Sequence, residues 1–112
     1  MSDPSPTPTF LVYAPYYTDA DILSRRNAAR PHHLEHIEGL VKSGIIRVGG
    51  ILMEPEPAPG NAPNPVGSSM IVQMGSASEV REMLKVDPYY VSNVWDKEKL
   101  VVLGFFAATP LP

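Results

Sequence analysis

Residues 31–53 read PHHLEHIEGLVKSGIIRVGGILM and change from helical to β-strand character at Gly44. The apolar residues of the first half recur at helical spacing and form one predicted buried stripe: Leu34, Ile37, Leu40 and Val41. The second half, residues 45–53, is rich in β-branched residues and is typical of a strand. Its Gly49–Gly50 pair indicates a bulge or a close backbone approach. This stretch therefore predicts a helix that leads directly into a strand.

Pro31 is expected to be the first residue of this helix, because its missing N–H has no partner at that position. Proline also disfavours helical geometry at the residue before it, so a separate short helix should end at Arg30. Asp19 or Asp21 could cap that first helix. The region before residue 44 is thus expected to hold two helical pieces broken at Pro31.

The remaining segments complete a β-α-β-β-α-β order. The predicted elements are a strand at residues 10–14, a third strand at 68–75, a helix at 78–85 capped by Ser78 and ended by Asp87–Pro88, and a last strand at 100–108. Residues 54–67 hold five prolines and should form a long loop, and residues 89–98 an aromatic-rich connection. The pattern predicts an α+β, ferredoxin-like split βαβ fold, with a four-stranded antiparallel sheet and its helices on one face.

The second and fourth strands are almost continuously apolar, although helices on one face can cover only half of the sheet. We expect a second copy of the chain to cover the other face and form a homodimer; the alternative is that long loops fold over it. Residues 1–9, with proline at every second position from Pro4 to Pro8, should be a flexible arm before a single domain at 10–112.

Composition narrows the classes of function. The chain has 112 residues, of which 44% are hydrophobic and 19% charged, as expected for one globular domain. A net charge of −3 disfavours nucleic-acid binding. The sequence shows neither a membrane-length apolar run nor a secretory signal, so we expect no membrane partner and a cytoplasmic location. It contains no cysteine, which excludes disulfides, thiolate nucleophiles and cysteine-bound metals.

The densest polar cluster is residues 30–36, which contain three histidines. At about 100° per residue from Leu34, His33 lies at about 260°, inside the arc of the apolar stripe, whereas His36 and His32 turn towards solvent. A histidine in that position is more often a core residue than a catalyst. Asp87, just after the second helix, is a possible partner. A carboxylate bound to one imidazole nitrogen leaves the other as a general base near neutral pH.

An ordered set of motifs resembles the YCII (YciI-like) family of the dimeric α+β barrel superfamily. The set comprises Arg26, Arg30-Pro31-His32-His33-Leu34, Gly49-Gly50, Gly67-Ser68 and Asp87-Pro88-Tyr89, and the resemblance covers about residues 10–108. It implies the fold and the dimer expected above, and an active-site pair at His33 and Asp87. This sequence departs from the family pattern at His32 and at Ser92–Asn93, where the family commonly has a small residue and glycine.

Other residues could bind a substrate. Arg30, or less favourably Arg26, could hold a developing enolate or phenolate oxygen, whereas Arg25 reads as a solvated helix surface. Ser68 or Ser69 could donate to a substrate oxygen, although a hydroxyl at a strand start commonly bonds locally. Two aromatics that could wall a pocket or belong to the core are Tyr89 and Trp95.

The first functional hypothesis is a cofactor-independent lyase or isomerase with His33 as general base and Asp87 as its orienting partner. The resemblance implies a small conjugated substrate, such as a hydroxyaromatic or quinonoid ring. The competing hypothesis is a non-catalytic metabolite-binding or accessory module. A third hypothesis is oxidative chemistry, which no feature of the sequence selects. His32 and His36 have metal-binding spacing but lack a third ligand, so we expect no metal.

Overall fold

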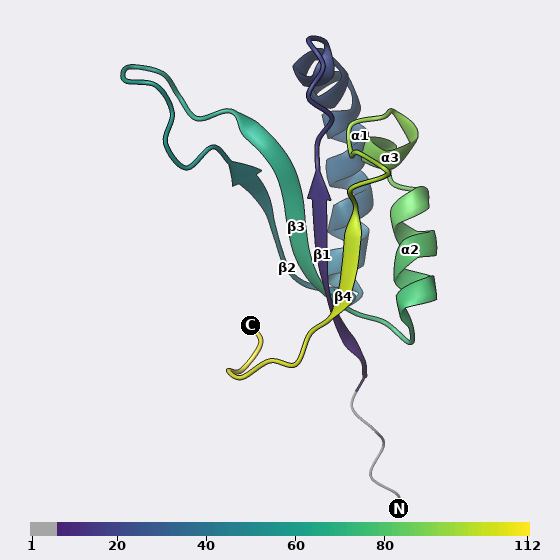
Figure 1. Cartoon of the computed structure of the whole chain (residues 1–112). Coiled ribbons are helices and arrows are strands. Elements are labelled where there is room, and N and C mark those ends of the chain that lie inside the picture. The colour runs from purple at the N-terminus through teal and green to yellow at the C-terminus, as the bar shows by residue number, and fades with distance from the viewer. Residues whose placement is uncertain (1–6) are drawn as a thin grey trace, which may run out of the picture.

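The computed structural model describes residues 7–112 and confirms the predicted α+β fold. In order, the elements are β1 (Thr9–Pro15), α1 (Ile22–Lys42), β2 (Ile46–Met53), β3 (Pro65–Gln73), α2 (Ala77–Lys85), α3 (Pro88–Val91) and β4 (Val101–Gly104). The strands form one antiparallel sheet in the order β2-β3-β1-β4 (Figure 1). Residues 1–6, most of the predicted flexible arm, lie outside the described residues, and Thr9 already pairs with Gln73 in the sheet.

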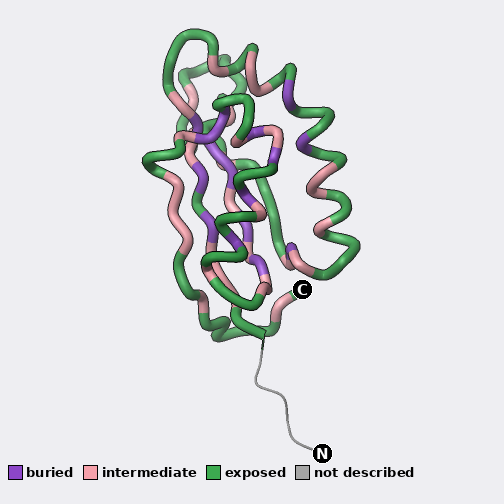
Figure 2. The backbone as a smooth tube through the Cα atoms, turned by 90° about the vertical axis from the view of Figure 1, so that its right-hand side faces the viewer, coloured by how far each residue is buried: buried purple, intermediate pink, exposed green. Residues whose placement is uncertain are grey.

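The core lies between the sheet and the helices. Alternate residues of the two central strands, Val12 and Ala14 on β1 and Met70 and Val72 on β3, are buried on the side of the sheet that faces the helices. From the helical side and the connections after it, the core receives Val80, Leu84, Tyr89, Val94 and Trp95. In contrast, buried residues occur at only two places along α1 (Figure 2).

The predicted break at Pro31 is wrong, because α1 runs without interruption for 21 residues with Pro31 inside it. Proline cannot donate the intrahelical hydrogen bond at that position. The packing of Ala29 and His33, one on each side of Pro31, holds both halves against the core. Asp21 is the N-cap of α1 but makes no side-chain cap bond. Asp19 accepts instead, from the backbone N–H of Asp21 at its carboxylate and from that of Ile22 at its carbonyl, both at 3.2 Å.

Arg25 is not the solvated surface residue that was expected. Its guanidinium donates to both carboxylate oxygens of Asp19, at 2.6 and 2.7 Å, and to the carbonyl of Asn93. These hydrogen bonds lower the pKa of Asp19 to about 2. Asn93 has a φ of 57°, in the left-handed region where asparagine is the usual substitute for glycine.

Two local features after β3 differ from the prediction. The cap of α2 is Ser76 and not Ser78: its hydroxyl accepts from the backbone N–H of Glu79 at 3.1 Å. The expected connection at residues 89–98 begins instead with the short helix α3. Asp87 is its N-cap and Pro88 its first residue, which is the favoured place for proline.

The strand ends and the bulge also shift. β3 begins at Pro65, since a first strand residue needs no N–H. β4 stops at Gly104, short of the predicted end at residue 108, although the backbone N–H of Phe105 still donates to the carbonyl of Thr9 at 2.8 Å. The two register shifts in β2 fall between Ile46 and Val48 and between Leu52 and Met53. Neither is at Gly49–Gly50, which pair regularly with β3.

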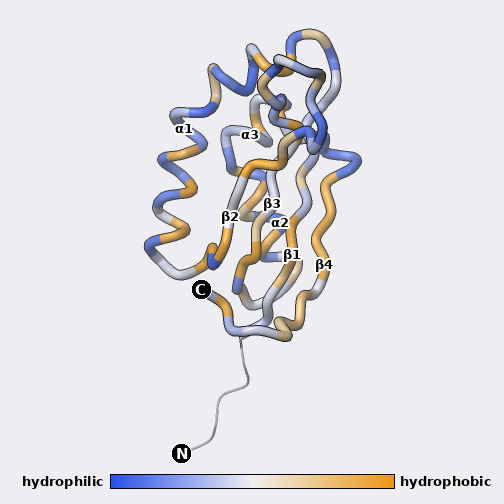
Figure 3. The backbone as a smooth tube through the Cα atoms, turned by 90° about the vertical axis from the view of Figure 1, so that its left-hand side faces the viewer, coloured by the Kyte–Doolittle hydropathy of each residue, from blue (hydrophilic) through white to orange (hydrophobic). Residues whose placement is uncertain are grey.

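The sheet face opposite the helices is apolar, and no helix of residues 7–112 covers it. By register and alternation it carries Leu11, Tyr13, Val48, Leu52, Ile71, Val101 and Leu103. Tyr13 is 44% exposed and Leu103 is 55% exposed. Figure 3 views the strands from this side and shows hydrophobic stretches on β1, β2 and β4. Within the described residues, no helix has the length and apolar character needed to span a membrane.

Candidate active site

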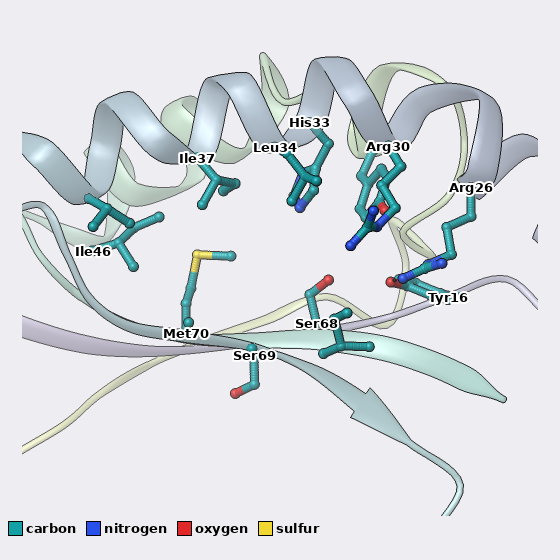
Figure 4. A pocket seen from close by; sticks show the side chains of 15 residues that line it. Tyr16, Arg26, Arg30, His33, Leu34, Ile37, Ile46, Ser68, Ser69 and Met70 are labelled. Carbon is teal, nitrogen blue, oxygen red and sulfur yellow. Dashed lines mark hydrogen bonds between the residues drawn. The ribbon is translucent and has the colours of Figure 1, made fainter. Parts of the chain in front are cut away.

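His33 and Asp87 form a buried pair. Nδ1 of His33 lies 2.7 Å from Oδ1 of Asp87, and the two residues are 8% and 1% exposed. His33 comes from the middle of α1, and Asp87 from the turn between α2 and α3. Because Nδ1 is engaged, Nε2 is the ring nitrogen left for other partners. Figure 4 shows the outer end of the imidazole directed into the space between α1 and the sheet.

Aromatic rings fix the imidazole in place. The ring of Tyr89 stacks on His33 with centroids 3.7 Å apart and planes 5° from parallel. Trp95 meets both rings edge-on, at 5.8 Å from His33 and 5.9 Å from Tyr89. Such stacked and edge-to-face contacts restrict the ring to one plane. The imidazole is therefore held by a hydrogen bond at one edge, a stacked face and a perpendicular ring.

The same carboxylate also organises the backbone. Oδ1 of Asp87 accepts from the backbone N–H of Tyr89 at 2.8 Å and so caps α3. The cap positions the Tyr89 ring that stacks on His33. One oxygen atom thus links the helix start, the stacked ring and the imidazole.

A cavity of about 270 Å³ opens in front of this pair, between α1 and the helix-facing side of β2 and β3. Its polar lining consists of Tyr16, Arg26, Arg30, His33, Ser68, Ser69 and Tyr89. Its apolar lining includes Leu34, Ile37, Val41, Ile46, Ile51 and Met70, together with Gly49 and Gly50. In Figure 4, Ile37, Ile46 and Met70 lie towards one end and Arg26, Arg30 and Tyr16 towards the other, with His33 between them.

Two arginines and two tyrosines form the polar end. Nε of Arg26 donates to the hydroxyl of Tyr16 at 3.2 Å. The exposed Arg30 forms no hydrogen bond or ion pair with any residue from 7 to 112. Burial, with a further contribution from Tyr16, raises the pKa of Tyr89 to about 12 against the opposing effect of the two guanidiniums. Tyr89 therefore stays protonated at neutral pH.

Of the two candidate serines, only Ser68 points into the cavity. Its Oγ accepts from Nε1 of Trp95 at 3.1 Å, which leaves the hydroxyl hydrogen free to donate. Ser69 points to the other side of the sheet and donates to the carbonyl of Val12 (Figure 4). Trp95, predicted as a substrate-binding residue, does not line the cavity. It is fully buried behind His33 and Tyr89, where its N–H supports Ser68.

The family assignment rests on a match over most of the chain. The model of the YCII-related domain matches residues 9–103, which include every residue of the site above. The chain belongs to the YCII family.

The relatives of this YCII chain include proteins named for biosynthesis or for biosynthesis clusters. One is the "Derivative of benzaldehyde biosynthesis cluster protein C" of Emericella nidulans, 42% identical over 63% of this chain and 74% of that protein. Another is the "Aspercryptin biosynthesis cluster protein B" of the same organism, 34% identical over 76% of this chain and 55% of that protein. "Fusaric acid biosynthesis protein 2" of Gibberella fujikuroi is 28% identical over 76% and 82%. The YCII chain spans little more than half the length of the second relative.

A solved YCII-like structure shares the fold. It is the 5-chloro-2-hydroxyhydroquinone dehydrochlorinase of Burkholderia phenoliruptrix in complex with 2,5-dihydroxybenzoquinone. The two structures superpose with a TM-score of 0.68 over 84% of this chain and 89% of the other. At 23% sequence identity, the likeness shows the fold.

The structure places some YCII residues differently from the expectation. Leu34 and Val41, predicted to be buried, are 44% and 51% exposed, because α1 leaves the cavity open beneath them. His32 is exposed as expected, but His36 is half-buried, and its Nε2 is enclosed without a partner among the described residues. Residues 7–112 contain no cluster of three or more metal-ligating side chains.

Sequence reasoning missed Tyr16. It lies directly after β1, forms an isolated bridge with Trp95, and meets Tyr89 edge-on at 5.9 Å. Its position in the sequence could have identified it, because a polar aromatic residue at the end of a central strand lies near the start of the following helix. That helix start carries Arg26, the partner of the Tyr16 hydroxyl.

Proposed function

We propose that this protein is a cofactor-independent enzyme of the lyase or isomerase type, with His33 as its general base. The observation that carries the proposal is the buried hydrogen bond from Nδ1 of His33 to Asp87, beside a cavity. Asp87 holds one tautomer of the imidazole and stabilises its protonated form, so it acts as a positioning residue. Nε2 then accepts a proton from a substrate in the cavity.

The proposed step removes a proton from a carbon of a conjugated ring. The C–H bond breaks, the proton moves to Nε2 of His33, and the electron pair moves into the ring and onto an oxygen as an enolate or phenolate. In a lyase, the pair returns to expel a leaving group as an anion, and the imidazolium then gives its proton to that anion or to water. In an isomerase, the imidazolium returns the proton to a different ring carbon. Both outcomes regenerate neutral His33 and need no cofactor.

Three groups are suited to the developing oxyanion. Arg30 contributes a guanidinium without a competing acid, and such a group favours planar anions. The Tyr89 phenol is protonated at neutral pH, as an ordinary tyrosine is, and can donate a hydrogen bond; burial raises its pKa further, to about 12. Ser68 contributes a hydroxyl whose acceptor side is already occupied by Trp95. Arg26 acts through Tyr16, to which its Nε donates.

The comparisons support the substrate class. The structural neighbour is a dehydrochlorinase of a hydroxylated ring and holds a dihydroxybenzoquinone. The fungal relatives belong to biosynthetic clusters, one of them for a benzaldehyde derivative. A small hydroxyaromatic or quinonoid ring is therefore the proposed substrate type.

Hydrogen exchange tests the general base without knowledge of the natural substrate. The probe is 2,5-dihydroxybenzoquinone in D2O, and NMR follows the ring hydrogens, whose exchange requires proton delivery to and removal from a ring carbon. We expect the protein to accelerate exchange, and His33→Gln to lower the acceleration by about a hundredfold or more. His32→Gln, one residue away on the exposed side, is the matched control. If wild type and His33→Gln bind the probe and exchange its ring hydrogens at equal rates, the general-base proposal is rejected and the binding-module hypothesis is retained.

We also propose that two copies of the chain associate through the uncovered sheet face. The exposed apolar side chains there, among them Tyr13 and Leu103, extend over all four strands. An apolar face of this extent is typical of an interface between identical subunits.

A further inference from the structure

We propose that the substrate carries an apolar chain next to its anionic ring, and that the groove under the C-terminal half of α1 binds this chain. The inference rests on the proposed function, because it names the substrate class of the same cavity. It follows from the division of the cavity into a cationic end and an apolar end.

The charge of the lining favours an anionic ring. The whole protein has a net charge of −3, yet the cavity is lined by Arg26 and Arg30 and by no carboxylate among residues 7–112. Both guanidiniums lie on the same side of His33, at the end of the cavity that holds Tyr16 (Figure 4). A neutral or cationic ring would leave Arg30 without a counter-charge. A phenolate, enolate or carboxylate would supply one.

The other end of the cavity is too long for a ring alone. Eight residues separate His33 from Val41 on α1, which is about 12 Å along the helix at about 1.5 Å per residue. Leu34, Ile37 and Val41 recur on one helix face over this distance and line the cavity. Ile46 and Met70 line it from the sheet. A single six-membered ring held at His33 would leave this apolar length unfilled.

On the helix side, the apolar end is not part of the packed core, although Ile46 and Met70 on the sheet side are core residues. Leu34 and Val41 are large apolar residues, and both are about half exposed. They lie on the helix side of the sheet, whereas the proposed subunit interface, with Tyr13 and Leu103, lies on the opposite side. They also open into the same cavity as His33. A hydrocarbon chain attached to a ring at His33 therefore reaches them without a second partner.

A series of para-alkylbenzoates tests the inference by calorimetry: benzoate, para-butylbenzoate and para-hexylbenzoate. Burial of each methylene should tighten binding several-fold, so the dissociation constant should fall roughly tenfold from butyl to hexyl. Val41→Ser should reduce that gain to about twofold or less, because it makes the far end of the groove polar. Val91→Ser, at an exposed valine of α3 outside the cavity, is the matched control and should keep the full gain.

The head of the substrate is tested with the same series. Arg30→Gln should weaken all three ligands by a similar factor and leave the gain per methylene unchanged. No gain with chain length in the wild type, or an equal gain in Val41→Ser, would overturn the inference, as would the absence of binding throughout. If the gain is absent while His33-dependent exchange persists, the inference alone fails. If the gain persists without His33-dependent exchange, the proposed catalysis fails and the binding groove stands.

Discussion

Asp87 lies 54 positions after His33 in the sequence, and its Oδ1 is 2.7 Å from Nδ1 of that histidine. The same oxygen caps α3, the short helix that follows Asp87. The histidine contact and the cap can be separated by mutation, because asparagine keeps a side-chain oxygen for a cap and alanine does not. The pair is buried, so either change should be visible in both stability and chemistry.

We expect Asp87→Ala to lower the free energy of unfolding by about 1 kcal/mol more than Asp87→Asn does, since only alanine loses the cap. Asp87→Asn should still lower His33-dependent exchange by about tenfold or more, because the amide no longer stabilises the imidazolium. Urea unfolding and the exchange assay measure the two effects. Equal stability of the two variants would argue against the cap.

Tyr89 should titrate apart from the other tyrosines. Its pKa is raised by burial to about 12 from an ordinary value of 10.0, so the folded state holds this proton more tightly than the unfolded state. Stability contributed by the group is complete below pH 10 and should be lost as pH rises towards 12. Tyr89→Phe should remove both the late step in tyrosinate absorbance and this part of the stability loss. Tyr17→Phe is the control variant, and an unchanged late step in Tyr89→Phe would contradict the assignment.

The uncovered sheet face predicts a dimer. Light scattering of the wild type should give the mass of two chains at micromolar concentration. Leu103→Asp puts a charge on the apolar face, at a side chain that is 55% exposed, and should shift the mass to one chain. Val91→Asp, at a site that is 64% exposed and away from this face, should leave the mass unchanged. A wild-type mass of one chain would exclude the proposed association.

Pro31 is expected to lower the free energy of unfolding, because it lies inside a helix. Pro31→Ala restores a backbone donor inside α1 and removes a ring that opposes helical packing, so unfolding should need about 2 kcal/mol more free energy, less a small loss from the freer unfolded chain. Thermal and urea denaturation measure the change. A destabilised Pro31→Ala variant would mean that the proline is required for the path of α1.

The sequence predicted the sheet, the split βαβ order and the His33–Asp87 pair, because apolar periodicity and an ordered motif set survive without tertiary information. It failed where tertiary packing overrides a local rule. Pro31 is a helix breaker in isolation, yet α1 continues because Ala29 and His33 are buried on either side of it. The exposure of Leu34 was equally hidden, since periodicity indicates which residues share a face but not whether that face meets a core or a cavity.

Because Oδ1 of Asp87 both contacts His33 and caps α3, the stage of folding at which the His33 site forms can be inferred. The imidazole is oriented only after the segment around residue 87 has docked onto α1, and that docking needs the α3 turn to be closed. A nascent or partly unfolded chain therefore carries a histidine with no fixed tautomer and no ring stacked upon it. For the general-base role that we propose for His33, the required geometry forms only with the complete tertiary structure, so we expect partly folded molecules to be inactive.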